Sequence, residues 1–345
     1  MERFHPISRV EELEVDQSVA YNWEYDNDRQ RLVRLYENAK RDQWNGTERL
    51  DWSIDVDPES EVIPDLAIGI YGTPMWTKLT PSEVKRLRHE AITWQLCQFL
   101  HGEQGALLAT AQIVDTTPWF EAKQYGATQV MDEARHVEVY RRFIQEKLEH
   151  EYPVNAELKK LLDLILTDSR WDMKFLGMQI MVEGLALAAF GTMRDTTNNA
   201  LLRDLTAGVM EDEARHVAFG VLSLRELYRD LPERDRAERE DFVYEASVLM
   251  RDRILNRDVW QRMGMDADAC VEASEQSELA REFRRRLFSK IVPNVKSLGL
   301  LSDRQRRRFE DLGILEFEAG TTSDVDHDIE FERRVRAGEV ELSAA

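Results

Sequence analysis

The residues best suited to chemistry form a pattern that occurs twice along the chain. The sequence DEARHV is found at 132–137 and again at 212–217. Each copy holds a glutamate and a histidine three positions apart, and residues at that spacing project from one face of a helix. A carboxylate beside an imidazole in this arrangement can bind a metal ion. The residues concerned are Glu133 and His136 in the first copy and Glu213 and His216 in the second.

A single glutamate precedes each copy by the same distance. The interval from Glu103 to Glu133 equals the interval from Glu183 to Glu213. Turn signals fall near positions 117 and 197, about halfway between the members of each pair. At a rise of about 1.5 Å per residue, each glutamate lies roughly 21–24 Å from its turn, so the two members of a pair are level across a helical hairpin. The pattern predicts two hairpins related by an internal repeat.

The surroundings of these groups are apolar. Four carboxylates facing a hydrophobic interior are very costly unless cations neutralise them, which two metal ions would do. Oxygen and imidazole donors suit iron or manganese. Surface ion pairs are the alternative interpretation, but the apolar flanks do not suit a solvated helix face. The neighbours expected to line a pocket are Leu107, Ile180, Leu187, Phe190, Val209 and Met210.

The stretch from Glu103 to His216, about a third of the chain, resembles the ferritin-like di-iron carboxylate superfamily. One glutamate from each of two helices and Glu-x-x-His from each of two others is the pattern shared. The resemblance implies two iron ions, with a manganese–iron pair as the alternative. It implies that the ligands and catalytic residues are Glu103, Glu133, His136, Glu183, Glu213 and His216. It also implies that the histidines are oriented by a surrounding set, Asp132, Arg135, Asp212 and Arg215.

The same resemblance implies a dioxygen-activating oxidoreductase that acts on a small, largely hydrophobic substrate. Hydroxylation or desaturation is the principal expectation, with a ferredoxin or a flavin reductase as the electron donor and a homodimer as the superfamily's usual state. Three alternatives stay open: an arylamine N-oxygenase, a non-catalytic iron-storage protein and a ribonucleotide reductase small subunit. Ferritins are usually much shorter than this chain of 345 residues, which argues against storage.

Two positions bear on these alternatives. Tyr140 lies four residues after His136, where reductase small subunits carry a radical tyrosine, although a core tyrosine is the preferred interpretation. Similar N-oxygenases carry an additional histidine ligand at the position of Val209, and its absence argues against N-oxygenation of that type.

The elements that must position these residues are expected to be long helices. Thr80-Pro81-Ser82-Glu83 combines an N-cap, a first-turn proline and a capping box, which predicts a helix from Pro81 to about Asp115. The other long helices are expected at about 118–149, 171–194 and 200–230, with shorter ones near 29–40, 156–167, 233–256 and 279–290. Short turns between long helices are typical of an antiparallel four-helix bundle.

The predicted fold is therefore all-α, a ferritin-like four-helix bundle with additional helices at both ends. We expect an N-terminal wrap over 1–77, the bundle over 78–231 and accessory helices over 232–315. The acidic segment 316–345 has little periodicity and is expected to be a mobile tail.

Composition narrows the function further. The formal charge is 46 − 66 = −20, and such a surface repels phosphate backbones, which argues against a nucleic-acid partner. Cys97 and Cys270 have no short spacing that would indicate a disulfide framework or a thiolate metal site. Neither a signal core nor an uninterrupted apolar run of membrane-spanning length is evident, so the expected location is the cytoplasm.

Overall fold

Four long helical stretches carry the centre of the molecule. The computed structural model describes residues 11–57, 60–148 and 150–322. Every regular element within those ranges is helical. The long stretches are α3 (Pro81–Thr116), α4 (Phe120–Lys147), the continuous stretch Trp171–Thr196 and α8 (Ala200–Arg229).

Local sequence explains where these helices begin and end. The side chain of Thr80 accepts from the backbone N–H of Glu83, whose carboxylate accepts from the N–H of Thr80, so the predicted capping box starts α3. Asn199 is the N-cap residue of α8, and its side chain accepts a hydrogen bond from the backbone N–H of Leu202. The expected short helix α5 (Ala156–Thr167) is also present, with Asn155 as its cap.

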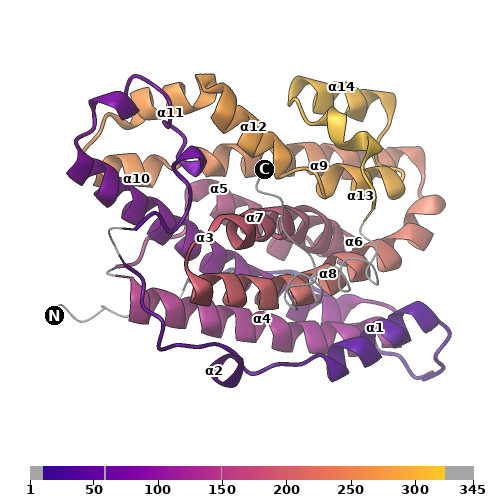
Figure 1. The fold of residues 1–345 in the computed structure, drawn as a ribbon. Helices are drawn as coiled ribbons and strands as arrows, with labels where there is room; N and C mark the ends of the chain where they lie inside the picture. The colour runs from indigo at the N-terminus through magenta and orange to yellow at the C-terminus, as the bar shows by residue number, and fades with distance from the viewer. Residues whose placement is uncertain (1–10, 58–59, 149, 323–345) are drawn as a thin grey trace.

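The long helices pack as two antiparallel pairs, α3 with α4 and α7 with α8, and α4 lies beside α8 to join the pairs (Figure 1). The fold is thus the all-α, ferritin-like bundle that the sequence predicts. The third stretch is not one regular helix. It consists of α6 (Trp171–Phe175), a π-helical segment (Leu176–Val182) and α7 (Glu183–Thr196).

The N-terminal segment lies along the bundle. Helix α1 (Gln30–Arg41) packs against α4 and α8, and the single turn α2 (Gly46–Arg49) follows it along α4 (Figure 1). Leu32, Leu35 and Ala39 of α1 are buried in this packing. Because α1 spans two helices of the bundle, the loop after it reaches side chains between them.

The C-terminal helices cover the opposite side of the bundle (Figure 1). The predicted helix 233–256 ends earlier, as α9 (Glu233–Asp252) and a 3₁₀ turn (Arg253–Leu255), because Asn256 adopts a left-handed conformation with φ of 54°. The predicted helix 279–290 is α12 (Glu278–Arg286). The sequence did not predict α10 (Arg257–Arg262), α11 (Ala267–Gln276), α13 (Ile291–Ser297) and α14 (Asp303–Asp311).

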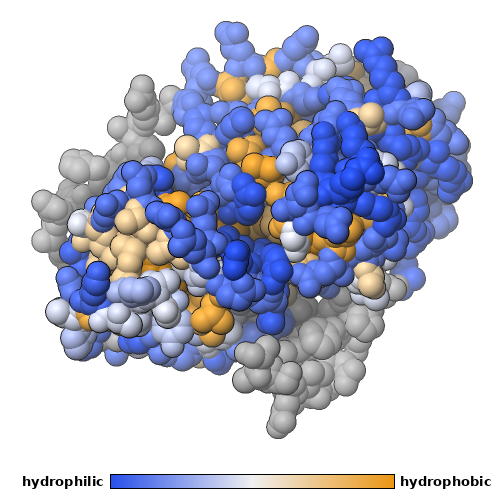
Figure 2. Space-filling model, turned by 90° about the horizontal axis from the view of Figure 1, so that it is seen from above, coloured by the Kyte–Doolittle hydropathy of each residue, from blue (hydrophilic) through white to orange (hydrophobic). Residues whose placement is uncertain are grey.

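The surface over these accessory helices is mostly hydrophilic, with scattered apolar side chains (Figure 2). In the segment expected to be a mobile tail, Leu315–Ala319 forms a 3₁₀ helix. The rest of that prediction, residues 323–345, lies outside the described residues.

The stretch Trp171–Thr196 is the one helix among the described residues that is long and apolar enough to cross a membrane. Of its most apolar window, 78% is buried inside the protein. Its central residue Glu183 faces the other bundle helices, and Lys174 donates to the carbonyl of Leu166 at the end of α5 (3.1 Å). In this structure the stretch serves as a core helix.

Candidate metal centre

Six buried side chains from four helices converge at the middle of the bundle. Their donor atoms form two overlapping groups, and within each group the atoms lie within 4.8 Å of one another. One group comes from α3, α4 and α8, and the other from α4, α7 and α8. The first comprises Glu103, Glu133, His136 and Glu213, and the second comprises Glu133, Glu183 and His216. The structure therefore brings together all six residues that the sequence singled out, each at most 5% exposed.

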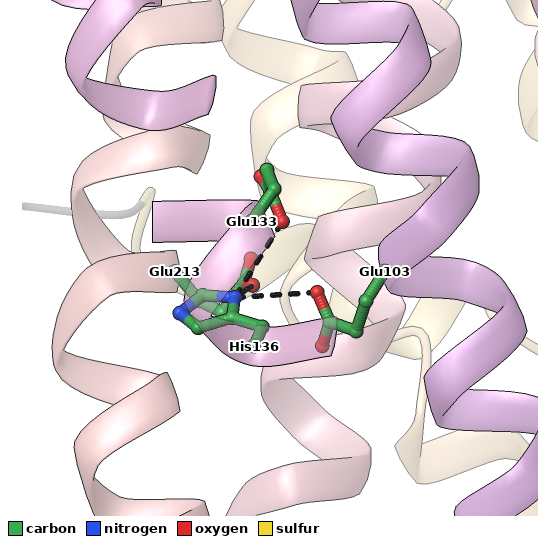
Figure 3. Close-up of side chains that lie close together, drawn as sticks. All are labelled: Glu103, Glu133, His136 and Glu213. Carbon is green, nitrogen blue, oxygen red and sulfur yellow. Dashed lines mark hydrogen bonds and ion pairs between the residues drawn. The ribbon is translucent and has the colours of Figure 1, made fainter. Parts of the chain in front are cut away.

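The Nδ1 atom of His136 faces three carboxylates. It lies 3.2 Å from Oε2 of Glu103, 3.3 Å from Oε1 of Glu213 and 3.5 Å from Oε2 of Glu133 (Figure 3). The four side chains point toward one another from α3, α4 and α8 (Figure 3). A position among these four atoms is surrounded by three oxygens and one nitrogen, a donor set suited to iron or manganese.

The second histidine has a matching environment. The Nδ1 atom of His216 lies 3.2 Å from Oε1 of Glu133 and 3.5 Å from Oε2 of Glu213. Glu133 and Glu213 thus approach both imidazoles, whereas Glu103 approaches only His136. These two carboxylates therefore lie between the two histidines, an arrangement that would suit two neighbouring cations.

Two aspartates hold the far sides of the imidazoles, and they do so crosswise. Nε2 of His136 lies 3.0 Å from Oδ2 of Asp212, and Nε2 of His216 lies 3.3 Å from Oδ2 of Asp132. Each aspartate therefore serves the histidine of the other repeat. An Nε2–H that donates to a carboxylate leaves the Nδ1 lone pair for a metal ion.

Two arginines lie between these aspartates. The guanidinium of Arg135 donates to Asp132 (2.5 Å) and to Asp212 (2.9 Å), and Arg215 donates to Asp212. Arg215 is only 1% exposed, so this network is inside the protein. The four surrounding residues expected from the sequence form one ion-pair network that links the two DEARHV copies.

The N-terminal segment completes this network with residues that the sequence analysis missed. Nε1 of Trp44 donates to Oδ2 of Asp212 (2.8 Å), and Nε2 of Gln43 donates to Oδ1 of Asp132 (2.7 Å). Arg135 donates back to Gln43 (2.7 Å) and lies over the Trp44 ring. No spacing signal marks Gln43 or Trp44, because they come from a loop far away in sequence.

A third missed residue is Gln129. Its Nε2 atom donates to Oε1 of Glu183 (2.8 Å) and to Oε1 of Glu133 (3.0 Å), so it fixes carboxylates of α7 and α4 together. Gln129 lies four residues before Glu133, and that one-turn spacing could have identified it.

The π-helical segment ends at Glu183. The backbone N–H of Glu183 donates to the carbonyl of Met178, five residues earlier, which is the π pattern. Such segments are rare and often occur at functional sites. Helix α8 approaches the segment at Gly220, where a Cβ atom would lie 2.6 Å from Cβ of Gln179. The irregular turn therefore sets the position from which Glu183 enters the centre.

The electrostatics of the centre are those of a site that needs cations. Burial raises the pKa of Glu103 to about 8, and burial together with the Glu213 charge raises the pKa of Glu183 well above its ordinary value. Burial would also raise the pKa of Glu133, but the charges of the two histidines outweigh it and hold that pKa low. The carboxylates thus compete for protons, and positive ions would relieve this competition.

Unpartnered atoms give an independent test of this interpretation. Oε2 of Glu133, Glu183 and Glu213 and Nδ1 of His216 are buried without a hydrogen bond to any described residue. Buried polar atoms normally have partners, and metal coordination would supply them here. The donor types and these unsatisfied atoms fit two metal ions, so we describe the centre as a di-metal carboxylate site.

The residues expected to line a pocket lie around the centre in different ways. Ile180, Phe190 and Val209 are buried, and Leu187 and Met210 form part of a surface pocket of about 460 Å³.

Tyr140 is buried against Phe190, with ring centroids 5.9 Å apart, and its hydroxyl has no hydrogen bond within the described part of the chain. Leu107 differs from expectation: it is partly exposed and lies outside the hydrophobic core, because it falls beside the exposed edge of α3.

The chain resembles one described protein family and several solved structures. The family described as p-aminobenzoate N-oxygenase AurF matches residues 26–299. No curated protein sequence matches the chain. An R2-like ligand-binding oxidase with a Mn/Fe cofactor is 19% identical, with 75% of this chain and 93% of that chain covered and a TM-score of 0.49. A protein from Synechococcus with aldehyde deformylating oxidase activity is 20% identical, with 61% and 95% covered and a TM-score of 0.44.

Proposed function

We propose a function that starts from the family: the chain belongs to the p-aminobenzoate N-oxygenase AurF family, whose match spans most of its length. It is accordingly an oxygenase with a di-metal site. Within that class, we propose that it inserts one oxygen atom of dioxygen into an N–H bond of an aromatic amine. The second oxygen atom leaves as water, and an external donor supplies the two electrons and two protons that balance the reaction.

The observation that carries this proposal is the buried centre itself. Six donors, four of them carboxylates, converge in an interior where they need two cations. When bound, redox-active metal ions would supply the Lewis-acid and electron-transfer chemistry that dioxygen requires. We propose that the ligands are Glu103, Glu133, His136, Glu183, Glu213 and His216, and that the metals are two iron ions, with manganese–iron as the competing pair.

The side chains around the donors have separate tasks. Asp132 and Asp212 accept from the histidines and orient them, while Gln129 holds two carboxylates in place. Phe190 and Tyr140 close one side of the centre with apolar surface that excludes water. Excluding water protects a reactive centre from side reactions and strengthens its electrostatic interactions.

The family match favours N-oxygenation over the hydroxylation or desaturation that was the principal expectation from sequence. Val209 is buried beside the last Glu-x-x-His, where similar N-oxygenases carry an additional histidine. We therefore propose that this member of the family performs its reaction with six protein ligands rather than seven. The ferredoxin or flavin reductase donor, the homodimer and the cytoplasmic location stay predictions.

The first experiment measures metal content and visible absorption after anaerobic ferrous protein is mixed with dioxygen. We expect about two metal ions per chain, an absorption change that depends on both iron and dioxygen, and oxidation of an aromatic amine to its hydroxylamine. Glu133→Gln is expected to remove the second metal ion and the reaction, because this carboxylate faces both histidines.

Glu138→Gln is the matched control, since Glu138 lies on the same helix but is exposed to solvent. It should bind two metal ions and react as the unmodified protein does. If Glu133→Gln retained both metal ions and full reactivity, the centre would be misassigned. If metal and dioxygen chemistry were normal but hydrocarbon substrates were oxidised in place of amines, N-oxygenation would be wrong and hydroxylation correct.

A further inference from the structure

The proposed reaction consumes two protons, and the six metal ligands lie too deep to take them directly from bulk solvent. Each ligand is at most 5% exposed. A proton reaches such a site along polar side chains or bound water molecules that connect it with the surface. Within the described residues, groups of this kind extend from the centre toward the start of α4.

Polar residues recur at four-residue intervals on α4 and end at a metal ligand. They are Glu121, Tyr125, Gln129 and Glu133. Residues four apart are neighbours on one helix face, so these side chains form a file. Tyr125 and Gln129 are fully buried, whereas Glu121 is 4% exposed and accepts from the backbone N–H of Arg29 (2.9 Å). The file therefore runs from the surface, beneath the N-terminal segment, to the centre.

The π-helical segment places another polar side chain beside the middle of the file. The ring of Tyr125 packs against Phe219 of α8, with centroids 4.5 Å apart. The next residue of α8, Gly220, lies so close to Gln179 that a Cβ atom there would be 2.6 Å from Cβ of Gln179. Because they contact consecutive residues of α8, Tyr125 and Gln179 are level along the bundle.

Ser223 of α8 lies at the outer end of the file. Arg29 contacts both helices there, since its backbone N–H donates to Glu121 and its guanidinium lies 3.5 Å from Glu226. Ser223 is one turn after Phe219 and one turn before Glu226, which places it level with Glu121. It is 1% exposed.

The polar atoms along the file lack partners. Those without a hydrogen bond to any residue that the structure describes are the hydroxyl oxygen of Tyr125, Oε1 of Gln129, both amide atoms of Gln179 and Oγ of Ser223. Buried polar groups are normally satisfied, and a buried water molecule typically makes about three hydrogen bonds to such groups. Unpartnered atoms in successive layers between surface and centre therefore indicate bound water.

The other sides of the centre suit proton transfer less. Beyond the Nε2 atoms of the imidazoles lie the guanidiniums of Arg135 and Arg215, whose charges repel an excess proton in a buried site. Toward the turn between α7 and α8, the rings of Phe99, Phe190 and Tyr140 pack together, with the centroids of Phe99 and Phe190 4.7 Å apart.

We propose that Tyr125, Gln129, Gln179 and Ser223 hold a file of water molecules that carries protons from Glu121 to the di-metal centre. The inference rests on the proposed function and deepens it, because it gives the path by which the two protons of that reaction arrive. These are positioning and relay residues, and the residue that links them to the centre is Gln129, whose Nε2 atom donates to two ligand carboxylates.

Each transfer conserves protons. A proton that enters at the Glu121 carboxylate passes to a neighbouring water molecule, which releases one of its own to the next group. The Tyr125 hydroxyl accepts a proton on one side and gives its own on the other, and burial raises the pKa of Tyr125, so the hydroxyl is the resting form. The two amides orient water without changing their protonation. Two protons delivered in this way, with two electrons from the external donor, complete the oxygen atom that leaves as water.

The test follows the reaction of the anaerobic ferrous protein with dioxygen by stopped-flow absorption, in H₂O and in D₂O. Tyr125→Phe removes the hydroxyl and retains the ring against Phe219. We expect its rate to fall about tenfold or more and its solvent isotope effect to exceed that of the unmodified protein, because proton transfer then limits the reaction. Metal content should not change. Tyr244→Phe, the same substitution on α9 beneath Arg308, is the control and should react normally.

Gln179→Met adds a measurement that does not depend on activity. Removing a buried amide that binds nothing leaves stability unchanged or raises it, whereas removing an amide that binds water lowers it. We expect the unfolding temperature of Gln179→Met to fall and its reaction with dioxygen to slow as in Tyr125→Phe. A higher unfolding temperature with a normal rate would contradict the inference.

Unchanged rates and isotope effects in both variants would overturn the inference. Loss of metal ions from both variants would also overturn it, since these side chains would then hold the ligands rather than carry protons. Ser223→Ala, at the end of the file away from the ligands, separates the two roles. A slower reaction at full metal content supports a proton path, and a normal reaction opposes it.

These outcomes are distinct from failure of the proposed function. If the protein oxidised hydrocarbons in place of amines, N-oxygenation would be wrong, but the three variants would still slow the reaction with dioxygen. If an aromatic amine were oxidised at the full rate in all three variants, only the proton path would be wrong.

Discussion

Each histidine of the centre depends on residues from two other parts of the chain. His136 is held by Asp212 of the second repeat, which in turn accepts from Trp44 of the N-terminal segment. Outer partners of this kind fix the tautomer and the orientation of a metal-binding imidazole. The chain Trp44–Asp212–His136 therefore couples the N-terminal segment to metal affinity.

Trp44→Phe removes the indole N–H while it retains an aromatic ring. We expect metal affinity to fall about tenfold, because Asp212 loses one of the donors that hold it against His136. Competition with a chelator of known affinity measures the change. Trp52→Phe is the control, since the Trp52 indole donates to the carbonyl of Gly46 and not to this network. Equal losses in both variants would mean that the network does not tune the metal.

A buried carboxylate outside the centre, that of Glu90, makes stability depend on pH. Glu90 accepts from the hydroxyl of Tyr152 (2.6 Å) and lies near His150 (2.9 Å) and Arg262 (3.0 Å). Burial opposes ionisation, but these partners outweigh it and lower the pKa of Glu90 from 4.5 to about 2. A depressed pKa in the folded state stabilises the fold above the unfolded value, and this contribution is lost as the pH falls from 4.5 toward 2.

Glu90→Gln should therefore destabilise the protein by about 2 kcal/mol at pH 7, where the charge and its partners are intact. The difference from the unmodified protein should shrink between pH 4.5 and pH 3, because protonation removes the same charge. Urea unfolding of both proteins at several pH values measures this difference in the free energy of unfolding. A difference that did not change with pH would mean that shape, rather than charge, is what Glu90 contributes.

At the scale of elements, two glycines beside Glu103 on α3 have different roles. A Cβ atom at Gly105 would lie 2.4 Å from Cδ2 of Leu162 on α5, whereas a Cβ atom at Gly102 would meet nothing within 4 Å among the described residues. Close packing of α5 thus requires the first glycine, and no such contact requires the second.

Gly105→Ala is expected to lower the free energy of unfolding by about 1–3 kcal/mol, because Leu162 must move away. Gly102→Ala should leave stability unchanged or raise it by up to about 1 kcal/mol, because alanine favours the helix. Denaturant unfolding of the two variants, measured in parallel, compares them. Equal changes in the free energy of unfolding would show that helix propensity, and not the contact with α5, determines the effect of alanine at both positions.

The predicted starts of the helices agree with the structure where a local sequence signal marks them. The capping box at Thr80 and the cap at Asn199 place the starts of α3 and α8, because each involves residues only three positions apart. The π-helical segment and the left-handed Asn256 have no such signal. They arise where packing against other helices outweighs the regular hydrogen-bond pattern, so periodicity alone predicted continuous helices there.

At the scale of the molecule, the centre joins both helical pairs of the bundle, so metal binding should stabilise the whole fold. A metal present at about one hundred times its dissociation constant adds about 2.7 kcal/mol. We expect the unfolding temperature to rise with anaerobic ferrous or manganous ions and to fall on chelation. In Glu213→Gln this rise should be small, because Glu213 approaches both histidines. An undiminished rise in that variant would place the stabilising metal elsewhere.

The sequence by itself determined that the protein is helical and that six donor side chains meet in a bundle. Helical periodicity, the caps and the equal glutamate intervals of the two DEARHV repeats are local or strictly repeated, and hairpin geometry converts them into proximity. Only the tertiary structure decided that each aspartate pairs with the histidine of the other repeat, and that Gln43 and Trp44 join this network. These depend on how elements distant in sequence pack together, and neither spacing nor composition records that packing.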